Sequence, residues 1–237
     1  TYSGDKNVDL FFDGKAITLM SSHGPDSTIL DCEGEERGIT FDWYEDSTSV
    51  FDGFTIINGS QSEGGGIYIV DSSPTIRNCI ITSCEADEGG GIYCESSDPM
   101  LTNVVITNNF PYNDEELLGQ SGGGIYLNYS NPVITASVIQ NNTADYGAGI
   151  RCNLGSSPEI TDVIILGNTA TFGHGGGIHS SSSSSNPSLT NVTISGNSAT
   201  HGGGGLYCSN YSNPVLNYVT FYNNTVTDNS WYVGGGG

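Results

Sequence analysis

The side chains best suited to metal chemistry lie in acidic turns close to runs of glycine. Carboxylates and backbone carbonyls in tight turns are the ligands that Ca²⁺ prefers. The acidic residues that could supply such ligands are Glu85, Asp87, Glu88, Asp114, Glu115 and Glu116. No Asp-x-Asp-x-Asp-Gly loop accompanies them, so plain solvation of acidic turns is the alternative. Calcium is the one cofactor that the sequence suggests.

A second set of chemically capable side chains follows the aliphatic residue that closes each glycine run. The set consists of Tyr68, Tyr93, Tyr126, Arg151, His179 and Tyr207. We expect these side chains to point outward, where rings about 4.8 Å apart could simply stack on one another. The same rings could instead present a platform to a sugar chain, which makes this set the candidate ligand-binding residues.

The elements that must position these residues form a repeat. A Gly-rich signature ends six times in an aliphatic residue, at intervals of 25 to 33 residues: Ile67, Ile92, Ile125, Ile150, Ile178 and Leu206. This interval is too short for a pair of helices with their turns and suits one coil of a β-solenoid. A proline follows each signature and gives a second register mark: Pro74, Pro99, Pro132, Pro158, Pro187 and Pro214.

Counting from these prolines aligns the apolar residues into columns. Seven residues on lie Ile81, Ile106, Ile139, Ile165, Ile194 and Phe221, which we expect to point into the bore of the solenoid. Six residues on, and therefore facing outward, lie Ile80, Val105, Val138 and Ile164. Because soluble monomers usually cover such a stripe, we interpret these four residues as an interface with a partner or with another part of the protein.

Ten residues after the prolines the columns become polar. This column contains Cys84 and then Asn109, Asn142, Asn168, Asn197 and Asn224. Asparagine tolerates left-handed backbone geometry and can hydrogen-bond both its own turn and the next coil. The column therefore predicts an asparagine ladder.

The succession of GGGIY, SSP, Asn-Cys or Asn-Val, Ile, Asn and Ala resembles the right-handed parallel β-helix repeat family, which includes pectate-lyase-like folds and polymorphic outer-membrane proteins. The resemblance is strong over residues 50–233, and residues 1–49 resemble the less regular opening coils of the same family. It implies an all-β, single-stranded right-handed β-helix of roughly 8–10 coils. We expect one domain over residues 1–237, as a fragment of a longer chain, with regular repeats over 50–237.

Resemblance to polysaccharide lyases and hydrolases prompts a search for their machinery. Gly173-His174-Gly175 matches one element of polygalacturonase-like sites, but no Asp-Asp pair or Arg-x-Lys accompanies it, so we interpret His174 as a turn residue. Glycoside hydrolysis needs two carboxylates about 5 to 9.5 Å apart, and we find no outward column with acids in adjacent coils. We therefore name no catalytic residue and favour a protein that is not an enzyme.

The six cysteines do not suggest disulfides. Cys94, Cys152 and Cys208 share one inward column but lie two coils apart, or about 9.6 Å, which is too far for a bridge. We expect buried free thiols, because unpaired cysteine behaves as a small apolar residue.

Composition narrows the function. The 26 acidic and five basic residues give a net charge of -21, which disfavours nucleic acid as a partner. No apolar run reaches the length of a membrane span. We expect a secreted or cell-surface domain for structure or adhesion, with glycans or other surface proteins as ligands. The alternatives are a polysaccharide lyase or hydrolase, a carbohydrate-binding module, and a subunit that stacks end to end into a filament.

Overall fold

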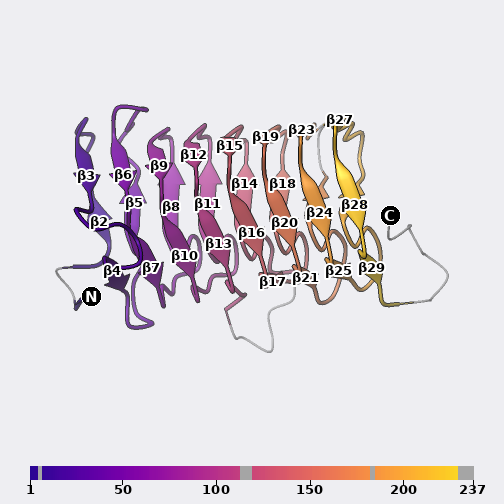
Figure 1. Cartoon of the computed structure of the whole chain (residues 1–237), viewed down its shortest axis with the longest axis horizontal. Helices are drawn as coiled ribbons and strands as arrows, with labels where there is room; N and C mark the ends of the chain where they lie inside the picture. The colour runs from indigo at the N-terminus through magenta and orange to yellow at the C-terminus, as the bar shows by residue number, and fades with distance from the viewer. Residues whose placement is uncertain (5–6, 113–118, 182–184, 229–237) are drawn as a thin grey trace.

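The chain folds into a parallel β-solenoid, as the repeat predicts. The structure is a computed structural model that describes residues 1–4, 7–112, 119–181 and 185–228, and these residues form 29 strands and no helix. Figure 1 shows the strands side by side along the long axis, with the N-terminal and C-terminal coils at opposite ends. Neighbouring strands pair in parallel from one end of the rod to the other, as β1 does with β4 and β24 with β28.

Three long sheets and one short sheet run the length of the rod. The nine-stranded sheet contains β1 (Tyr2–Ser3), β4 (Ile29–Asp31), β7 (Thr55–Ile57), β10 (Ile80–Thr82), β13 (Val105–Thr107), β16 (Val138–Gln140), β20 (Ile164–Leu166), β24 (Thr193–Ser195) and β28 (Thr220–Tyr222). One eight-stranded sheet, which we call the tyrosine sheet, contains β2 (Leu10–Phe11), β5 (Ile39–Phe41), β8 (Ile67–Val70), β11 (Ile92–Glu95), β14 (Ile125–Asn128), β18 (Ile150–Asn153), β22 (Ile178–Ser180) and β26 (Leu206–Cys208).

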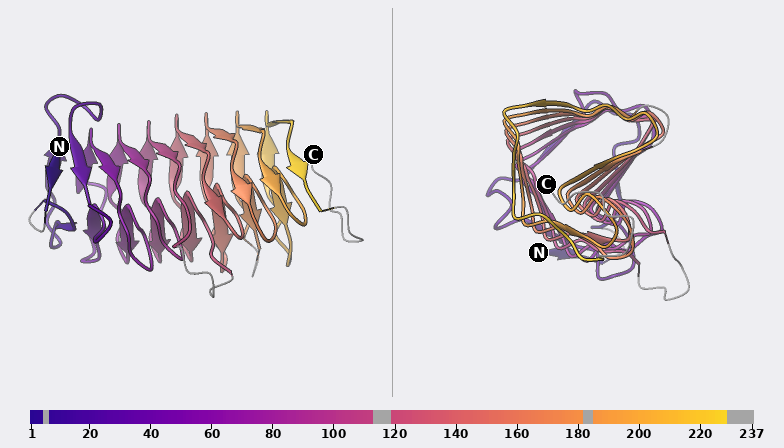
Figure 2. Two further views of the ribbon diagram at one scale, coloured as in Figure 1. Left: turned by 90° about the horizontal axis from the view of Figure 1, so that it is seen from below. Right: turned by 90° about the vertical axis from the view of Figure 1, so that its right-hand side faces the viewer.

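The other eight-stranded sheet contains β3 (Thr18–Met20), β6 (Val50–Asp52), β9 (Thr75–Arg77), β12 (Met100–Thr102), β15 (Val133–Thr135), β19 (Glu159–Thr161), β23 (Ser188–Thr190) and β27 (Val215–Asn217). The short sheet contains β17 (Thr143–Ala144), β21 (Thr169–Ala170), β25 (Ser198–Ala199) and β29 (Thr225–Val226). Sheets of eight and nine strands correspond to about eight coils, within the predicted range. The end view in Figure 2 shows the coils superposed, with one part of each coil folded inward.

The apolar columns stack in the predicted register. Ile81 pairs with Ile106, Ile106 with Ile139, and the column continues through Ile165 and Ile194 to Phe221. The five isoleucines are at most 1% exposed. Each coil therefore buries its apolar face only against its neighbours, which explains why the same residue types recur at the same offsets.

The predicted asparagine ladder forms, and the left-handed turn lies one residue before each ladder position. Nδ2 of Asn109 donates to Oδ1 of Asn142 at 3.0 Å, and the same bond repeats through Asn168 and Asn197 to Asn224. The left-handed residue is the one before each ladder position, for example Asn141 at φ 54°. The ladder residues themselves do not use the left-handed geometry that asparagine tolerates, because the preceding residue makes the turn and leaves the ladder side chain directed into the core.

A second ladder, built from the first serine of the SSP motifs or its counterpart in each coil, was not predicted. The buried members are Ser72, Ser97, Ser130, Ser156 and Ser185. The backbone N–H of Ser72 donates to Oγ of Ser97 at 3.1 Å, and Ser97 bonds Ser130 in the same way. The repeated serine before proline was the available signal, since a buried turn must satisfy its backbone donors.

The serine ladder ends on a buried carboxylate, Glu45, which is 2% exposed. Its oxygens accept hydrogen bonds from Gly14 N at 2.9 Å, Trp43 N at 3.0 Å and Ser72 Oγ at 2.9 Å. Burial raises the pKa of Glu45, but these hydrogen bonds outweigh it and the net pKa lies below the ordinary value. Glu45 thus ties the opening coils to the regular repeats.

The glycine triplets permit a close approach that no other residue allows. The first glycine is left-handed, as Gly64 shows at φ +62°, and a Cβ on the third, Gly66, would lie 2.6 Å from the carbonyl oxygen of Gly91 in the next coil. A side chain at this position would therefore clash with the backbone of the next coil.

The six cysteines are free in the structure, and five of them are buried. Burial raises the pKa of the Cys79 thiol to about 11 and that of Cys84 and Cys152 to about 12. The expectation that every cysteine is buried was wrong for Cys208, which is exposed because it lies on β26, the last strand of its sheet.

Candidate functional site

In each regular coil, the segment that contains the glycine run lies directly before a strand of the tyrosine sheet, and we call this segment the glycine arm. The residues with the most unusual environments lie between the glycine arms and the outer face of the tyrosine sheet, in a region that we call the seam. A Cβ on Gly89 would lie 2.9 Å from Cα of Tyr93, and one on Gly122 would lie 2.8 Å from Cβ of Tyr126. Each coil therefore folds its own glycine arm over the outward residue of the next strand.

The predicted ligand-binding residues line this seam, but several are covered. Tyr93 is 2% exposed, Tyr126 5% and His179 4%, whereas Tyr68, Arg151 and Tyr207 are partly exposed. The expectation that the whole set is open to solvent was wrong because the glycine arm packs on it.

The tyrosines form a stack. The rings of Tyr68 and Tyr93 lie 5.5 Å apart at an interplanar angle of 8°, and those of Tyr93 and Tyr126 lie 5.5 Å apart at 5°. The hydroxyl of Tyr93 donates to Glu95 at 2.9 Å, and that of Tyr126 accepts from Asn153 at 3.0 Å. Tyr93 therefore has a tyrosine ring of the protein itself on each of its two faces.

Two glutamates lie in adjacent coils of the seam. Glu63 and Glu88 are paired across a parallel bridge, so the prediction that no outward column has acids in adjacent coils was wrong. Burial raises the pKa of both carboxyls, and Glu95 raises that of Glu63 further. Tyr126 hydrogen-bonds Glu88 and partly offsets the shift. Both glutamates directly precede a glycine triplet, a signal that counting from the prolines did not use.

Arginines lie at two levels of the seam. The guanidinium of Arg37 lies 4.4 Å from the ring centroid of Tyr68, a cation–π contact. Arg151 replaces a tyrosine in the column, and its Nε and Nη1 are buried without a hydrogen-bond partner. Burial lowers the pKa of both arginines. Arg77 lies on β9 of another sheet and pairs with Asp52 at 2.9 Å.

Histidines gather at the C-terminal end of the seam. The ring of His174 stacks on Tyr207 at 4.1 Å, and His179 meets Tyr207 edge-on at 4.9 Å. Burial, Arg151 and His174 lower the pKa of His179 to about 2, and a hydrogen bond with the His174 backbone only partly opposes this shift. His174, interpreted as a turn residue, lies in the glycine arm directly before Gly175.

The predicted calcium ligands do not converge in the described part of the chain. Glu85 accepts from Ser60 at 2.8 Å and lines an open hollow of about 370 Å³ with Asp31 and Glu33. Asp87 accepts from Gln120, while Glu88 turns into the seam. Asp114, Glu115 and Glu116 lie outside the described residues.

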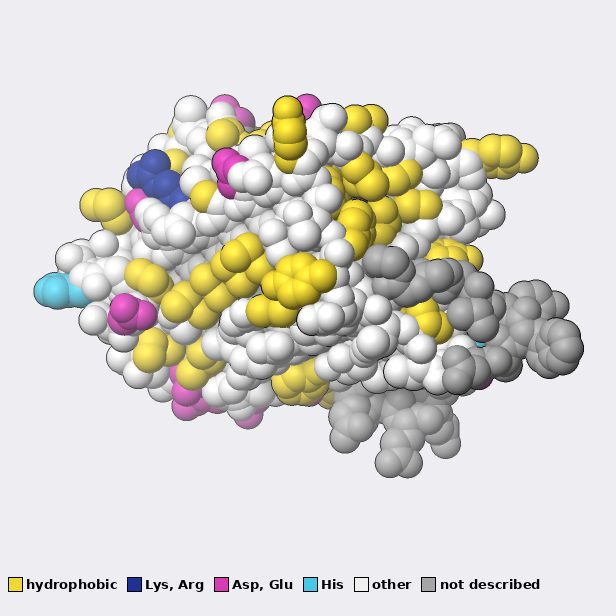
Figure 3. Space-filling view, turned by 45° about the vertical axis from the view of Figure 1, so that its right-hand side comes forward, with side chains coloured by type: hydrophobic (Ala, Val, Ile, Leu, Met, Phe, Trp, Pro, Cys, Tyr) yellow, Lys and Arg dark blue, Asp and Glu magenta, His cyan; other side chains and the backbone are white. Residues whose placement is uncertain are grey.

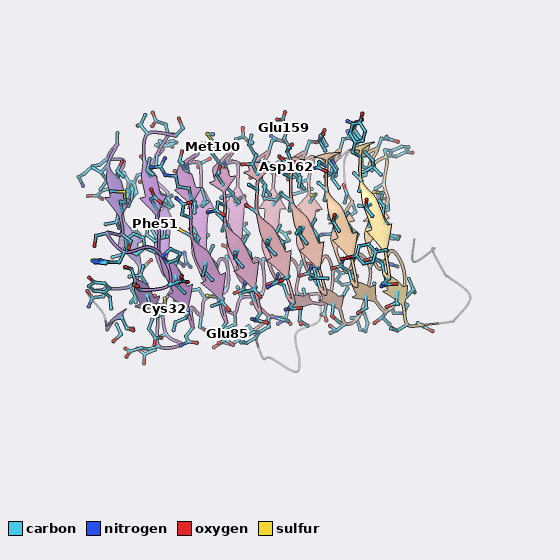
Figure 4. The ribbon with its side chains drawn as sticks, viewed as in Figure 1. Cys32, Phe51, Glu85, Met100, Glu159 and Asp162 are labelled. Carbon is cyan, nitrogen blue, oxygen red and sulfur yellow. The ribbon has the colours of Figure 1, made fainter. Side chains whose placement is uncertain are left out.

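No group of three His, Cys, Asp or Glu side chains suited to a metal ion occurs within the described ranges. Figure 4 shows Glu85 at one edge of the coils and Glu159 and Asp162 at the opposite edge. The acidic side chains labelled there are therefore spread around the coils.

The predicted interface residues form a continuous outward stripe on the nine-stranded sheet. Ile80, Val105, Val138 and Ile164 are paired in succession, the first three partly buried and Ile164 44% exposed. Figure 3 shows hydrophobic side chains gathered in a band along one face of the rod.

Comparison with known proteins agrees with this architecture. The family model described as the right handed beta helix region matches residues 16–194. A model described as the Chlamydia polymorphic membrane protein repeat matches residues 191–209. No curated protein and no solved structure matches the chain. Over its described residues, the chain has no apolar helix of membrane-spanning length.

Proposed function

Because the chain belongs to the right-handed β-helix family, we propose that it is a non-enzymatic, rod-shaped domain of a secreted or cell-surface protein. Its turns and outward columns would meet glycans or other surface proteins. The match to a repeat named for a membrane protein supports a surface location of the outer-membrane type. The surplus of 26 acidic over five basic residues keeps such a rod soluble and directs it away from anionic polymers.

The observation that carries this proposal is the uninterrupted stacking of the coils. The Ile81 to Phe221 column and the Asn109 to Asn224 ladder both continue without a break across six and five coils. Since every coil depends on its neighbours for burial, the rod has no independent part that can bend freely. Rigidity and reach are what a surface spacer requires.

The proposal is tested by separating binding from turnover. The purified chain is applied to a glycan array and incubated with a panel of acidic polysaccharides, with and without calcium. We expect retention on the array or on a cell surface, with no new reducing or unsaturated sugar ends. Release of such ends by the pure protein would overturn the non-enzymatic assignment.

A glycan-cleaving enzyme is the second candidate, and the Glu63–Glu88 pair favours it. The two glutamates occupy adjacent coils, about 4.8 Å apart along the rod, and both carboxyls have raised pKa values. Retaining glycosidases place their two carboxyl groups about 5 to 5.5 Å apart and keep one of them protonated. If turnover is found, Glu63→Gln and Glu88→Gln should each abolish it, while Glu159→Gln should not. Activity that survives both changes would exclude this pair.

Calcium binding and end-to-end assembly remain proposals with simple tests. If the acidic turns bind calcium, isothermal titration with CaCl₂ should show heat of binding, and Glu85→Gln and Asp87→Asn should each reduce it.

Val215 and Leu216 on β27 are 53% and 43% exposed, and an uncovered strand of this kind invites pairing with a second copy. Light scattering should then show a mass that rises with concentration, whereas a constant monomer mass would exclude filaments.

A further inference from the structure

We propose that Arg151, His174 and His179 form a binding site for a small oxyanion, in the seam between the tyrosine sheet and the glycine arm. The ligand class is a carboxylate, phosphate or sulfate group. This inference does not depend on the proposed function, because it rests on the buried nitrogen atoms of these three residues.

The first argument is the set of buried polar atoms without a partner. Nε and Nη1 of Arg151, Nδ1 of His174 and Nδ1 of His179 are all inaccessible to solvent and make no hydrogen bond among the described residues. His179 is only 4% exposed. A buried donor without a partner costs about 1–3 kcal/mol, and a charged one costs more. Nε and Nη1 of Arg151 are N–H donors that lack an acceptor, and each neutral imidazole adds a further donor in the tautomer that carries its proton on Nδ1.

The second argument is that the three side chains share one space. Arg151 on β18 pairs directly with His179 on β22, so the two side chains leave the sheet side by side in adjacent coils. The ring of His174 lies 6.0 Å from that of His179 and approaches from the glycine arm. The arm packs against both column residues, since a Cβ on Gly147 would lie 3.1 Å from Cβ of Arg151. Arg151 and His179 therefore line the seam from the sheet, and His174 lines it from the glycine arm.

The third argument is charge. Arg77 and Lys15 form ion pairs with Asp52 and Asp13, but no ion pair includes Arg151 among the described residues. Its guanidinium lies beside two imidazoles whose pKa values are lowered by burial and by Arg151 itself. Removing a cation from water without a counter-charge is unfavourable, and an oxyanion would supply that charge.

The chemistry of the donors selects the ligand. A guanidinium presents two parallel N–H groups that match two oxygens of a carboxylate, phosphate or sulfate. Each histidine is a neutral imidazole with a single N–H, and the tautomer that carries this proton on Nδ1 can donate to a remaining oxygen of the ligand. The aromatic rings of Tyr146 and Tyr207 border the histidines and exclude water from the site.

Glu88 is the group of the chain that could replace such a ligand. It acts electrostatically on Arg151 but forms no ion pair with it, and its carboxyl is instead bonded to Tyr126. A rearrangement that brings Glu88 onto Arg151 would satisfy the guanidinium without any anion. The experiment must therefore distinguish these two partners.

The test uses the full chain labelled with ¹⁵N and follows the Arg151 Nε–H and His179 imidazole signals by NMR. Sodium sulfate, sodium phosphate and sodium acetate are titrated separately, with sodium chloride holding the ionic strength constant. We expect saturable shifts of both signals with at least one of the three anions. If sulfate or phosphate binds with higher affinity than acetate, the ligand is a tetrahedral oxyanion. If acetate binds with higher affinity, the ligand is a carboxylate.

The variants Arg151→Tyr and His179→Tyr are suited to this site because the column already holds tyrosine in four other coils. Circular dichroism should confirm that both remain folded. We expect each variant to lower the affinity for the anion at least about tenfold, because each loses one hydrogen bond to the charged ligand. Arg77→Lys, which alters a paired arginine on another sheet, should bind as the wild type does.

Shifts that increase linearly without saturation would overturn the proposal, as would binding that Arg151→Tyr leaves unchanged. A third result would also overturn the proposal. In this result, Glu88→Gln shifts the Arg151 Nε–H signal in anion-free buffer, and no anion shifts that signal in the wild-type protein. Glu88 would then be the partner.

Discussion

Nδ2 of Asn142 donates to Oδ1 of Asn168 at 3.0 Å, and the same Nδ2 bonds the carbonyl of Ile106 in the coil on the other side. One fully buried side chain therefore joins three successive coils. Oδ1 of Asn142 also accepts from the backbone N–H of Asn109 at 3.0 Å.

Replacing Asn142 with alanine should destabilise the rod by about 3 kcal/mol or more. The change removes the acceptor of the buried backbone N–H of Asn109, the side-chain donor to the carbonyl of Ile106, and one of the two donors to Oδ1 of Asn168. Each buried group left without a partner costs about 1–3 kcal/mol. Urea unfolding followed by circular dichroism measures the loss. The exposed neighbour Asn141 is the control, because Asn141→Gly suits its φ of 54° and should change stability by less than about 1 kcal/mol. Equal losses in both variants would contradict the ladder.

Removing the central ring of the tyrosine stack should cost about 3–5 kcal/mol. Tyr93 is 2% exposed and stacks on Tyr68 and Tyr126, so Tyr93→Ala leaves a cavity. Tyr93→Phe keeps the stack and loses only the hydrogen bond to Glu95, at about 1 kcal/mol. Tyr218→Ala, at an 89% exposed position, should have almost no effect. A small loss in Tyr93→Ala would mean that the seam is open.

Acid should weaken the opening coils through Glu45. Because the pKa of folded Glu45 lies below the ordinary 4.5 of the unfolded chain, its stabilisation is complete above about pH 5 and disappears as the pH falls through the folded value. Glu45→Gln should lower the free energy of unfolding at pH 7 and flatten its decline below pH 5. Glu159→Gln removes an equal charge at an exposed site and should retain the wild-type pH profile. An unchanged profile in Glu45→Gln would contradict the role of this carboxylate.

The C-terminal coils should also lose stability in acid, through His179. Its folded pKa of about 2 lies below the ordinary 6.5, so the unfolded chain binds a proton that the folded chain does not. Stability contributed by neutral His179 is therefore lost as the pH falls below about 6.5, at up to about 1.4 kcal/mol per pH unit. Thermal unfolding between pH 7 and pH 5 should show a smaller decline in His179→Tyr than in the wild type. His23→Tyr, at an exposed site, should decline as the wild type does.

One thiol in the folded chain should react rapidly. Cys208 is exposed and the other five cysteines are buried, with burial raising their pKa values. Ellman's reagent should modify about one thiol per folded chain, and all six after denaturation. Cys208→Ser should abolish the fast reaction. Rapid modification of several thiols would mean that the core is open.

The register of the coils was predictable because the offsets from the prolines correspond directly to rungs of the solenoid. The buried column from Ile81 to Ile165 and the ladder from Asn109 to Asn224 follow from that count alone. Side-chain exposure in the seam was not predictable in this way, since periodicity places Tyr93 on the outer face but does not indicate that the glycine arm covers it. The Glu63–Glu88 pair does not follow from the proline register, because Glu63 precedes Pro74, the first of these prolines.

The stacking of the coils is tested most directly by distances between spin labels on one column. In a Cys208→Ser background, labels are attached through Thr18→Cys, Glu159→Cys and Val215→Cys, three exposed positions of the same sheet. Glu159 lies five strands from Thr18, and Val215 lies seven strands from it. At about 4.8 Å per coil, double electron–electron resonance should give separations of about 24 Å and about 34 Å. Equal distances, or distances that do not increase with the number of coils, would contradict the solenoid.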